Sequence, residues 1–125
     1  MEQTQGYCII HQTDCMENTK IVFYEGQALI SENSLFFCEN ENENTFTYVT
    51  DEFHIKRTGE VNTDVHLYLY QRGEATVESE YGLLVFDTEI VNYVVQDDDW
   101  TIEYKVLHGD DEVLHTKIEC KILKN

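Results

Sequence analysis

The sequence contains no proline and only two alanines among its 125 residues. Proline removes a hydrogen bond from a sheet, so its absence leaves every segment free to pair as a strand. Alanine is the strongest helix former, and its scarcity argues against helices. Strands favour Val, Ile, Thr, Tyr, Phe and Trp, and these six types supply 47 of the residues. The composition therefore predicts an all-β fold.

Basic residues are also scarce, because 8 lysines and arginines stand against 25 aspartates and glutamates, for a formal net charge of −17 at pH 7. Proteins bind phosphate backbones and anionic lipid surfaces through clustered Lys and Arg. We therefore expect no nucleic-acid partner and no membrane partner. An acidic surface of this kind could attract a basic partner, but we interpret it as a solvated surface without a partner.

The chain lacks a basic and apolar leader at its start, and it lacks any run of ~18–20 apolar residues. Its four cysteines, Cys8, Cys15, Cys38 and Cys120, include no C-x-x-C pair. Without a secretion signal we expect them to be reduced. These absences predict a cytoplasmic protein, and the length predicts one domain that spans residues 1–125.

Alternating apolar and polar residues predict half-buried strands along the chain. In Trp100–Val106 the inward face is predicted to carry Trp100, Ile102, Tyr104 and Val106. Leu114–Ile122 repeats the pattern, with Leu114, Thr116, Ile118, Cys120 and Ile122 inward. Gly26 is expected to mark a bulge in a strand over Lys20–Ile30. Leu83–Phe86 and Ile90–Gln96 are expected to be two strands joined near Asp87–Glu89.

Two hairpins follow one another in the middle of the chain. Cross-strand pairing predicts Ile55 opposite Val65, with a loop over Arg57–Thr63. The next hairpin is predicted to turn at Gln71–Gly73, with Gly73 in the left-handed conformation, which places Leu67 opposite Val77. One face would then carry Phe53, Ile55, Val65, Leu67, Leu69, Ala75 and Val77.

About ten short strands with turns between them predict a sandwich or a barrel. Sequential hairpins favour an up-and-down meander, and a closed meander has no exposed edges. We therefore expect an antiparallel up-and-down barrel of about 8–10 strands.

Four sequence runs stand out in the C-terminal two-thirds of the chain: IKRTG at Ile55–Gly59, YQRG at Tyr70–Gly73, EYGLLVFDT at Glu80–Thr88 and WTIEYKVLHG at Trp100–Gly109. In their order and spacing, these runs resemble the YwiB-like family of small bacterial proteins. The resemblance covers roughly Glu52–Ile122. It implies a calycin fold, which is a closed lipocalin-like barrel. The biochemical function of that family is not established, so the resemblance supplies no catalytic residues and suggests, by analogy of fold, a cavity for a small molecule.

One histidine pair invites a metal interpretation, since His54 and His66 are expected side by side with Asp64 or Glu52 nearby. Zinc requires about four well-placed ligands, and no convincing third and fourth ligands stand out. We interpret these residues as surface residues and predict no metal site and no cofactor.

The sequence contains no constellation typical of an enzyme. Cys8 and His11 are three residues apart and would lie on opposite faces of a strand. Cys15 lies near a loop, whereas Cys38 and Cys120 are expected to be small core residues. We therefore predict no catalytic residue and no enzyme.

Candidate ligand-binding residues combine positive charge with aromatic rings that carry polar tips. Arg57 and Arg72, with Lys56, form the densest basic spot outside the last two strands and would hold an anionic ligand at a barrel mouth. The other interpretation is ion pairing with Glu60, Asp64 and Glu74. The full candidate set is Arg57, Arg72, Tyr68, Tyr70, Tyr81, Trp100 and Tyr104.

Two functional hypotheses remain open from the sequence. The first is a barrel that binds a small, partly apolar ligand in its interior or mouth, which a cavity of ~300 Å³ or more would support. The alternative is a non-enzymatic interaction module with a filled barrel, such as a homodimer or a regulatory partner that uses an outer apolar patch.

Overall fold

The computed structural model describes residues 3–124, and in this part of the chain ten strands and no helix are present. No segment of this part is therefore a helix with the length and hydropathy needed to cross a membrane. The strands are β1 (Thr4–Asp14), β2 (Thr19–Ile30), β3 (Ser34–Glu39), β4 (Asn42–Val49), β5 (Glu52–Thr58), β6 (Asn62–Tyr68), β7 (Gln71–Ser79), β8 (Gly82–Val95), β9 (Asp99–His108) and β10 (Asp111–Lys124).

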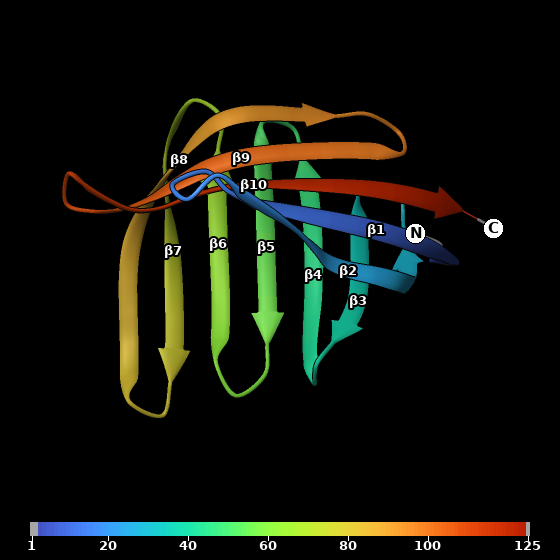
Figure 1. Ribbon diagram of the computed structural model, residues 1–125, viewed down its shortest axis with the longest axis horizontal. Helices are drawn as coiled ribbons and strands as arrows, with labels where there is room; N and C mark the ends of the chain where they lie inside the picture. Colours follow the sequence, from blue (N-terminus) through green and yellow to red (C-terminus); the bar gives the residue numbers. More distant parts are fainter. Residues whose placement is uncertain (1–2, 125) are drawn as a thin grey trace.

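Each strand pairs with its neighbours in the chain, and β1 pairs with β10, so the sheet closes into an antiparallel up-and-down barrel. The predicted fold class is confirmed. Figure 1 shows two sets of strands that cross: β3 to β7 run in one direction, and β9, β10, β1 and β2 run across them. The long strand β8 bends from the first set into the second. The core lies between the two sets.

Strand β8 differs from the prediction of two strands joined near Asp87–Glu89, because the chain continues as one strand through these polar residues. Its first part pairs with β7 and its second part pairs with β9, with an irregularity between Ile90 and Asn92. Thr88 lies where β8 is paired on both sides and is fully buried. Its hydroxyl donates to the carbonyl of His66 at 2.8 Å. Because this hydrogen bond satisfies the hydroxyl, Thr88 can be buried inside a strand and does not need to lie in an exposed turn.

The β5–β6 hairpin has the predicted register, with Ile55 opposite Val65. Its loop is shorter than predicted, because β5 continues to Thr58 and β6 begins at Asn62. This shorter loop leaves Arg57 within β5, paired with Thr63.

The predicted β6–β7 register is wrong. Val65 lies opposite Ala75, and the chain turns between Tyr68 and Gln71, so Leu69 is exposed. Gly73 lies inside β7 and has no left-handed backbone. A Cβ atom at Gly73 would lie 2.0 Å from the carbonyl oxygen of His66, so close backbone approach explains this glycine.

The predicted inward faces of β9 and β10 agree with the structure. Trp100, Ile102, Tyr104 and Val106 are buried, as are Thr116, Ile118, Cys120 and Ile122, while Leu114 is half-buried. Cys38 is exposed, contrary to its predicted place in the core, because the inward face of β3 carries Leu35 and Phe37.

The bulge predicted at Gly26 lies instead at Phe23. The β1–β2 register has Ile10 opposite Tyr24 and His11 opposite Val22, which leaves Phe23 as the extra residue. On its other side, β2 is paired with β3 at only two pairs of residues. Beyond those pairs the barrel wall is closed by side chains rather than by backbone hydrogen bonds, with the Tyr24 ring stacked on Phe37 at 4.5 Å.

Candidate functional site

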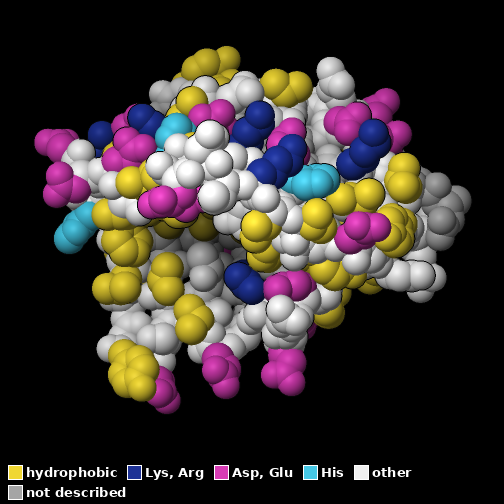
Figure 2. Space-filling view, viewed as in Figure 1, with side chains coloured by type: hydrophobic (Ala, Val, Ile, Leu, Met, Phe, Trp, Pro, Cys, Tyr) yellow, Lys and Arg dark blue, Asp and Glu magenta, His cyan; other side chains and the backbone are white. Residues whose placement is uncertain are grey.

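A cavity of about 240 Å³ lies between the two crossing sets of strands, lined from β1, β2, β4, β5, β6, β9 and β10. Figure 2 shows hydrophobic side chains around a hollow beneath the crossing strands. The apolar lining consists of Ile10, Phe46, Ile55, Val65, Leu114 and Ile118, with Phe23 from the β2 bulge. The polar lining consists of Gln12, Asn44, Arg57, Thr63 and Tyr104.

Arg57 brings the positive charge of the site. It follows Phe53 and Ile55 at alternate positions on β5, which places its side chain on the interior face of the strand. Its Nη2 donates to Glu39 at 2.9 Å, and its guanidinium lies 5.4 Å from the centre of the Phe23 ring. Glu39 therefore balances the charge, while the remaining donors of the guanidinium can serve a ligand.

Two further polar groups are almost fully buried at the cavity. Asn44 is 2% exposed, and its amide makes a long contact of 3.5 Å with the carbonyl of Asn42. Tyr104 is 6% exposed, and burial raises the pKa of its hydroxyl to about 12. Desolvation is the only cause of this shift, so no side-chain hydrogen bond to the phenol contributes to it. Buried polar groups normally find partners, so both residues retain hydrogen-bonding capacity that faces the cavity.

The size of the cavity limits what it can hold. Sites for drug-sized ligands occupy roughly 300–1,000 Å³, and the cavity falls just below this range at about 240 Å³. The barrel is thus neither filled by its own side chains nor open enough for a large ligand. A compact molecule with one apolar part and one polar end matches the lining.

The structure brings together two of the seven candidate binding residues, Arg57 and Tyr104, at this cavity. Trp100 is buried in the core, where it packs edge-to-face on Tyr48 and Phe53. Its indole Nε1 has no hydrogen-bond partner among the described residues. Trp100 therefore fills the interior rather than lining the cavity.

The remaining four candidates lie outside the barrel. Tyr68 is half-buried on the outer face, and Tyr70 and Tyr81 are exposed at turns. Arg72 pairs with Asp87 at 3.6 Å and Glu89 at 2.9 Å. Because Arg57 lies towards the β5–β6 loop and Arg72 begins β7, the two arginines lie at opposite ends of the β6 strand (Figure 1). They do not form one basic spot.

Sequence reasoning missed Asn44, Gln12 and Phe23. Asn44 belongs to the run Asn40–Asn44, whose composition is typical of a polar loop, yet it alternates with Phe46 along β4 and shares the interior face with it. That alternation was the available signal. Gln12 continues the interior series of Cys8 and Ile10 on β1 in the same way.

Three of the cysteines, Cys8, Cys15 and Cys120, lack the surroundings of a nucleophile. Burial raises the pKa of the Cys8 thiol to about 12 and also raises that of Cys120. Cys15 is half-exposed, and its pKa is raised by desolvation and by the charge of Glu103. A reactive cysteine needs the opposite shift, so Cys8, Cys15 and Cys120 are poor candidates for a nucleophile.

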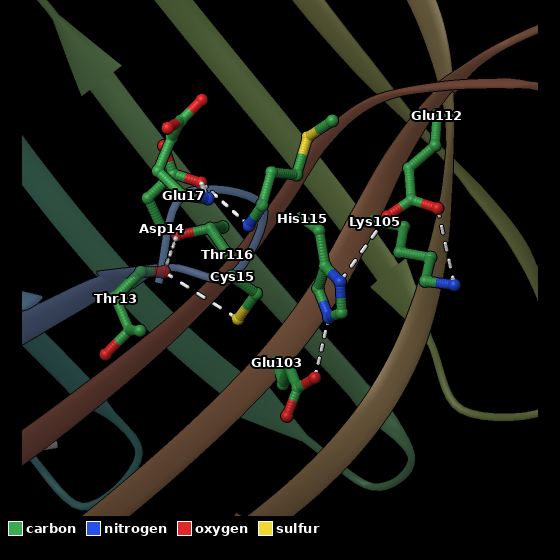
Figure 3. A network of polar contacts seen from close by, with 10 residues as sticks. Thr13, Asp14, Cys15, Glu17, Glu103, Lys105, Glu112, His115 and Thr116 are labelled. Carbon is green, nitrogen blue, oxygen red and sulfur yellow. Dashed lines mark hydrogen bonds and ion pairs between the residues drawn. The ribbon is translucent and has the colours of Figure 1, made fainter. Parts of the chain in front are cut away.

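Two clusters of potential metal ligands occur among residues 3–124, and both lie outside the cavity. In the first, His54 and His66 stack at 4.2 Å between ring centres, and His54 contacts Asp64 at 2.7 Å. The predicted adjacency of these residues agrees with the structure. The second joins Cys15, Glu103 and His115, as shown in Figure 3.

Comparison with known proteins adds information on the fold. No protein-family model matches the chain, and no curated protein sequence matches it. Among solved structures, the chain is similar to the crystal structure of the ywiB protein from Bacillus subtilis, with a TM-score of 0.67 and 10% identity. The match covers 98% of this chain and 93% of that chain. The protein therefore has a YwiB-like fold, in agreement with the resemblance of the sequence.

Proposed function

We propose that the protein is a non-enzymatic binding protein that holds a small, partly apolar molecule in the barrel cavity. The observation that carries this proposal is the juxtaposition of an apolar wall with the unfilled hydrogen-bonding capacity of Asn44 and Tyr104 beside the Arg57 guanidinium. Binding sites are mostly apolar pockets with a few convergent polar groups that orient the ligand.

The polar groups favour a hydrogen-bond acceptor over a net negative charge on the ligand. Arg57 offers several N–H donors, but its charge is balanced by Glu39 at 2.9 Å. The chain as a whole carries a net charge of −17, which disfavours the approach of an anion. A carbonyl or amide group would use the donors without this electrostatic cost.

The sequence resemblance and the crossing strands support a calycin, lipocalin-like classification, which we propose together with a cytoplasmic location. In small barrels of that class the interior holds packed side chains or one small ligand. The cavity of about 240 Å³ is smaller than the ~300 Å³ expected of such a site, so it is consistent with the second arrangement only for a compact ligand.

Titration of the ¹⁵N-labelled protein with benzamide, benzoate and benzyl alcohol tests the proposal, because the three probes share a ring and differ in the polar end. We expect benzamide to shift the side-chain amide signals of Asn44 most strongly. Arg57→Met should weaken the response, whereas Arg72→Met on the outside should leave it unchanged. If no probe shifts the Asn44 signals, or if Val65→Phe in the cavity wall leaves the shifts intact, the proposal fails.

A second candidate function, self-association, is favoured by the start of β8. Residues 83–86 are hydrogen-bonded to β7, whereas pairing with β9 begins only at Asp87. Leu83, Leu84 and Val85 are 58%, 60% and 50% exposed, so both faces of this segment are apolar and open to solvent. An edge strand of this kind can pair with another strand, which makes an antiparallel homodimer the specific alternative.

A further inference from the structure

Cys15, Glu103 and His115 converge at the outer end of the β1–β2 turn from three separate elements. Cys15 follows β1, Glu103 lies on β9 and His115 lies on β10. The potential ligand atoms of the three side chains all lie within 4.8 Å of one another. Figure 3 shows the Cys15 sulfur and the Glu103 carboxylate on the same side of the His115 ring.

Backbone contacts hold the turn that carries Cys15 against β10. The amide of Cys15 donates to the carbonyl of His115 at 2.8 Å. The hydroxyl of Thr116 donates to the carbonyl of Thr13 at 3.1 Å, and the Asp14 carboxylate accepts from the amides of the following turn. The thiol is thus positioned by the fold and does not depend on a mobile loop.

The two nitrogens of His115 have different partners. Nε2 lies 2.6 Å from the Glu103 carboxylate, while Nδ1 lies 3.4 Å from Glu112, which itself lies 3.5 Å from the Lys105 ammonium. A histidine that binds a metal usually donates its other ring N–H to a carboxylate, which fixes the tautomer and the orientation of the ring. Glu112 is placed for this role, and Nε2 then faces Cys15 and Glu103 with its lone pair.

We propose that Cys15, Glu103 and His115 bind a zinc-class divalent ion, with water at the fourth position. Thiolate and imidazole favour zinc and related transition metals, whereas calcium and magnesium require oxygen ligands. Zinc takes four ligands, so these three side chains leave one position of the ion, which water completes.

The His115–Glu103 pair requires only a small adjustment to accept the ion. Two ligand atoms that are each about 2 Å from a tetrahedral zinc ion lie roughly 3.3 Å apart. The separation of 2.6 Å between His115 Nε2 and Glu103 must therefore widen by less than an ångström. Both side chains are about one-fifth exposed, which leaves the carboxylate room to turn.

The cluster of His54, Asp64 and His66 is a matched comparison on the same barrel. It also offers three ligand atoms within 4.8 Å. However, it lacks a thiol, its side chains are more exposed, and its imidazole rings are stacked nearly parallel at 15°. We therefore assign the ion to the cysteine cluster and use the histidine cluster as a control.

Titration of the metal-free, reduced protein with Co²⁺, followed by calorimetry with Zn²⁺, tests the assignment. We expect a cobalt–thiolate charge-transfer band in the natural protein and in Cys38→Ser, and no such band in Cys15→Ser. Zinc affinity should fall by roughly 10–100-fold in Glu112→Gln, where the ligands are intact but the imidazole is no longer oriented. His54→Gln should bind zinc as the natural protein does.

Three outcomes would overturn the proposal: no cobalt–thiolate band in the natural protein, an undiminished band in Cys15→Ser, or a loss of zinc affinity in His54→Gln that equals the loss in His115→Gln. Circular dichroism of each variant separates lost binding from lost folding. The natural protein and Glu112→Gln decide the question even if Cys15→Ser fails to fold. These readouts do not depend on the barrel cavity, so the result is independent of the function proposed above.

Discussion

The Arg57 guanidinium lies over the ring of Phe23, 5.4 Å from its centre, and this contact bridges β5 and β2 across the interior. It lies beside the seam where β2 and β3 are in register at only two pairs of residues. Side-chain contacts at this position therefore do two things. They close a part of the wall that the backbone leaves open, and they place a charged group at the edge of the cavity.

Replacing Arg57 with Met should destabilise the barrel by about 1–3 kcal/mol, because Glu39, whose side chain is 14% exposed, would lose its charged partner. A double-mutant cycle with Phe23→Leu should give a coupling of about 0.5–1 kcal/mol for the cation–π contact. Urea denaturation measures both quantities. Lys56→Met on the outer face is the control and should change stability by less than about 0.5 kcal/mol. Equal effects of the two substitutions would contradict the structural role of Arg57.

The buried Tyr104 hydroxyl predicts a loss of stability at alkaline pH. Its pKa rises from 10.0 to about 12 on folding. The folded state therefore favours the neutral phenol, and the stabilisation is complete below pH 10 and is lost as the pH rises from about 10 to about 12. The loss should amount to about 2–3 kcal/mol. Urea denaturation at several pH values measures this loss. In Tyr104→Phe, the free energy of unfolding should change much less between pH 10 and pH 12.

At neutral pH the same substitution separates a structural from a binding role. Desolvation alone raises the pKa of the hydroxyl, with no contribution from a side-chain hydrogen bond, so Tyr104→Phe should leave stability unchanged or raise it slightly. Binding of benzamide should weaken. A Tyr104→Phe protein that is much less stable at pH 7 would show that the hydroxyl has a partner in the fold.

Much of the barrel could be predicted from local pattern. The register of β5 with β6 followed from matching Phe53 and Ile55 to the apolar residues of the next strand, because a shift by one residue would turn these side chains to solvent. The register of β6 with β7 could not be found in this way. It depends on an irregularity between His66 and Tyr68 and on the close approach of Gly73 to the His66 carbonyl, and neither is visible in the alternation of apolar and polar residues.

The cavity was only partly predictable for a similar reason. Arg57 stood out because cations are rare in this chain. Asn44 did not, because the run Asn40–Asn44 has the composition of a loop. In the structure, Asn40 and Glu41 both adopt positive φ, of 48° and 66°, and make a two-residue hairpin turn. The next asparagines are therefore free to extend β4 and to place an amide in the interior.

Gly73→Ala should be strongly destabilising, because the new methyl group would lie 2.0 Å from the His66 carbonyl oxygen and 2.6 Å from the Thr88 hydroxyl. Relief of these contacts requires a shift of backbone in three paired strands, at a cost of about 1–3 kcal/mol or more. Gly26→Ala is the matched control. Its methyl group would meet only the outer end of the Tyr24 side chain, with the hydroxyl at 2.8 Å and Cζ at 3.1 Å. This side chain can shift without moving backbone, so we expect a smaller cost, even though the hydroxyl donates to the carbonyl of Gln27 at 2.7 Å. Thermal denaturation of both variants tests the difference, and a more damaging Gly26→Ala would contradict the β6–β7 register.

The open edge at the start of β8 predicts weak self-association of the barrel through residues 83–86. Light scattering over a concentration series should show a dimer that gains affinity as salt is added, because salt screens the repulsion between two chains of net charge −17. Leu84→Lys should abolish the dimer, since charged side chains on an edge oppose pairing. Val22→Lys is the control, because Val22 is similarly exposed but lies on the free edge of β2. A strict monomer at high concentration and high salt would exclude the homodimer, and dissociation by Val22→Lys alone would move the interface to β2.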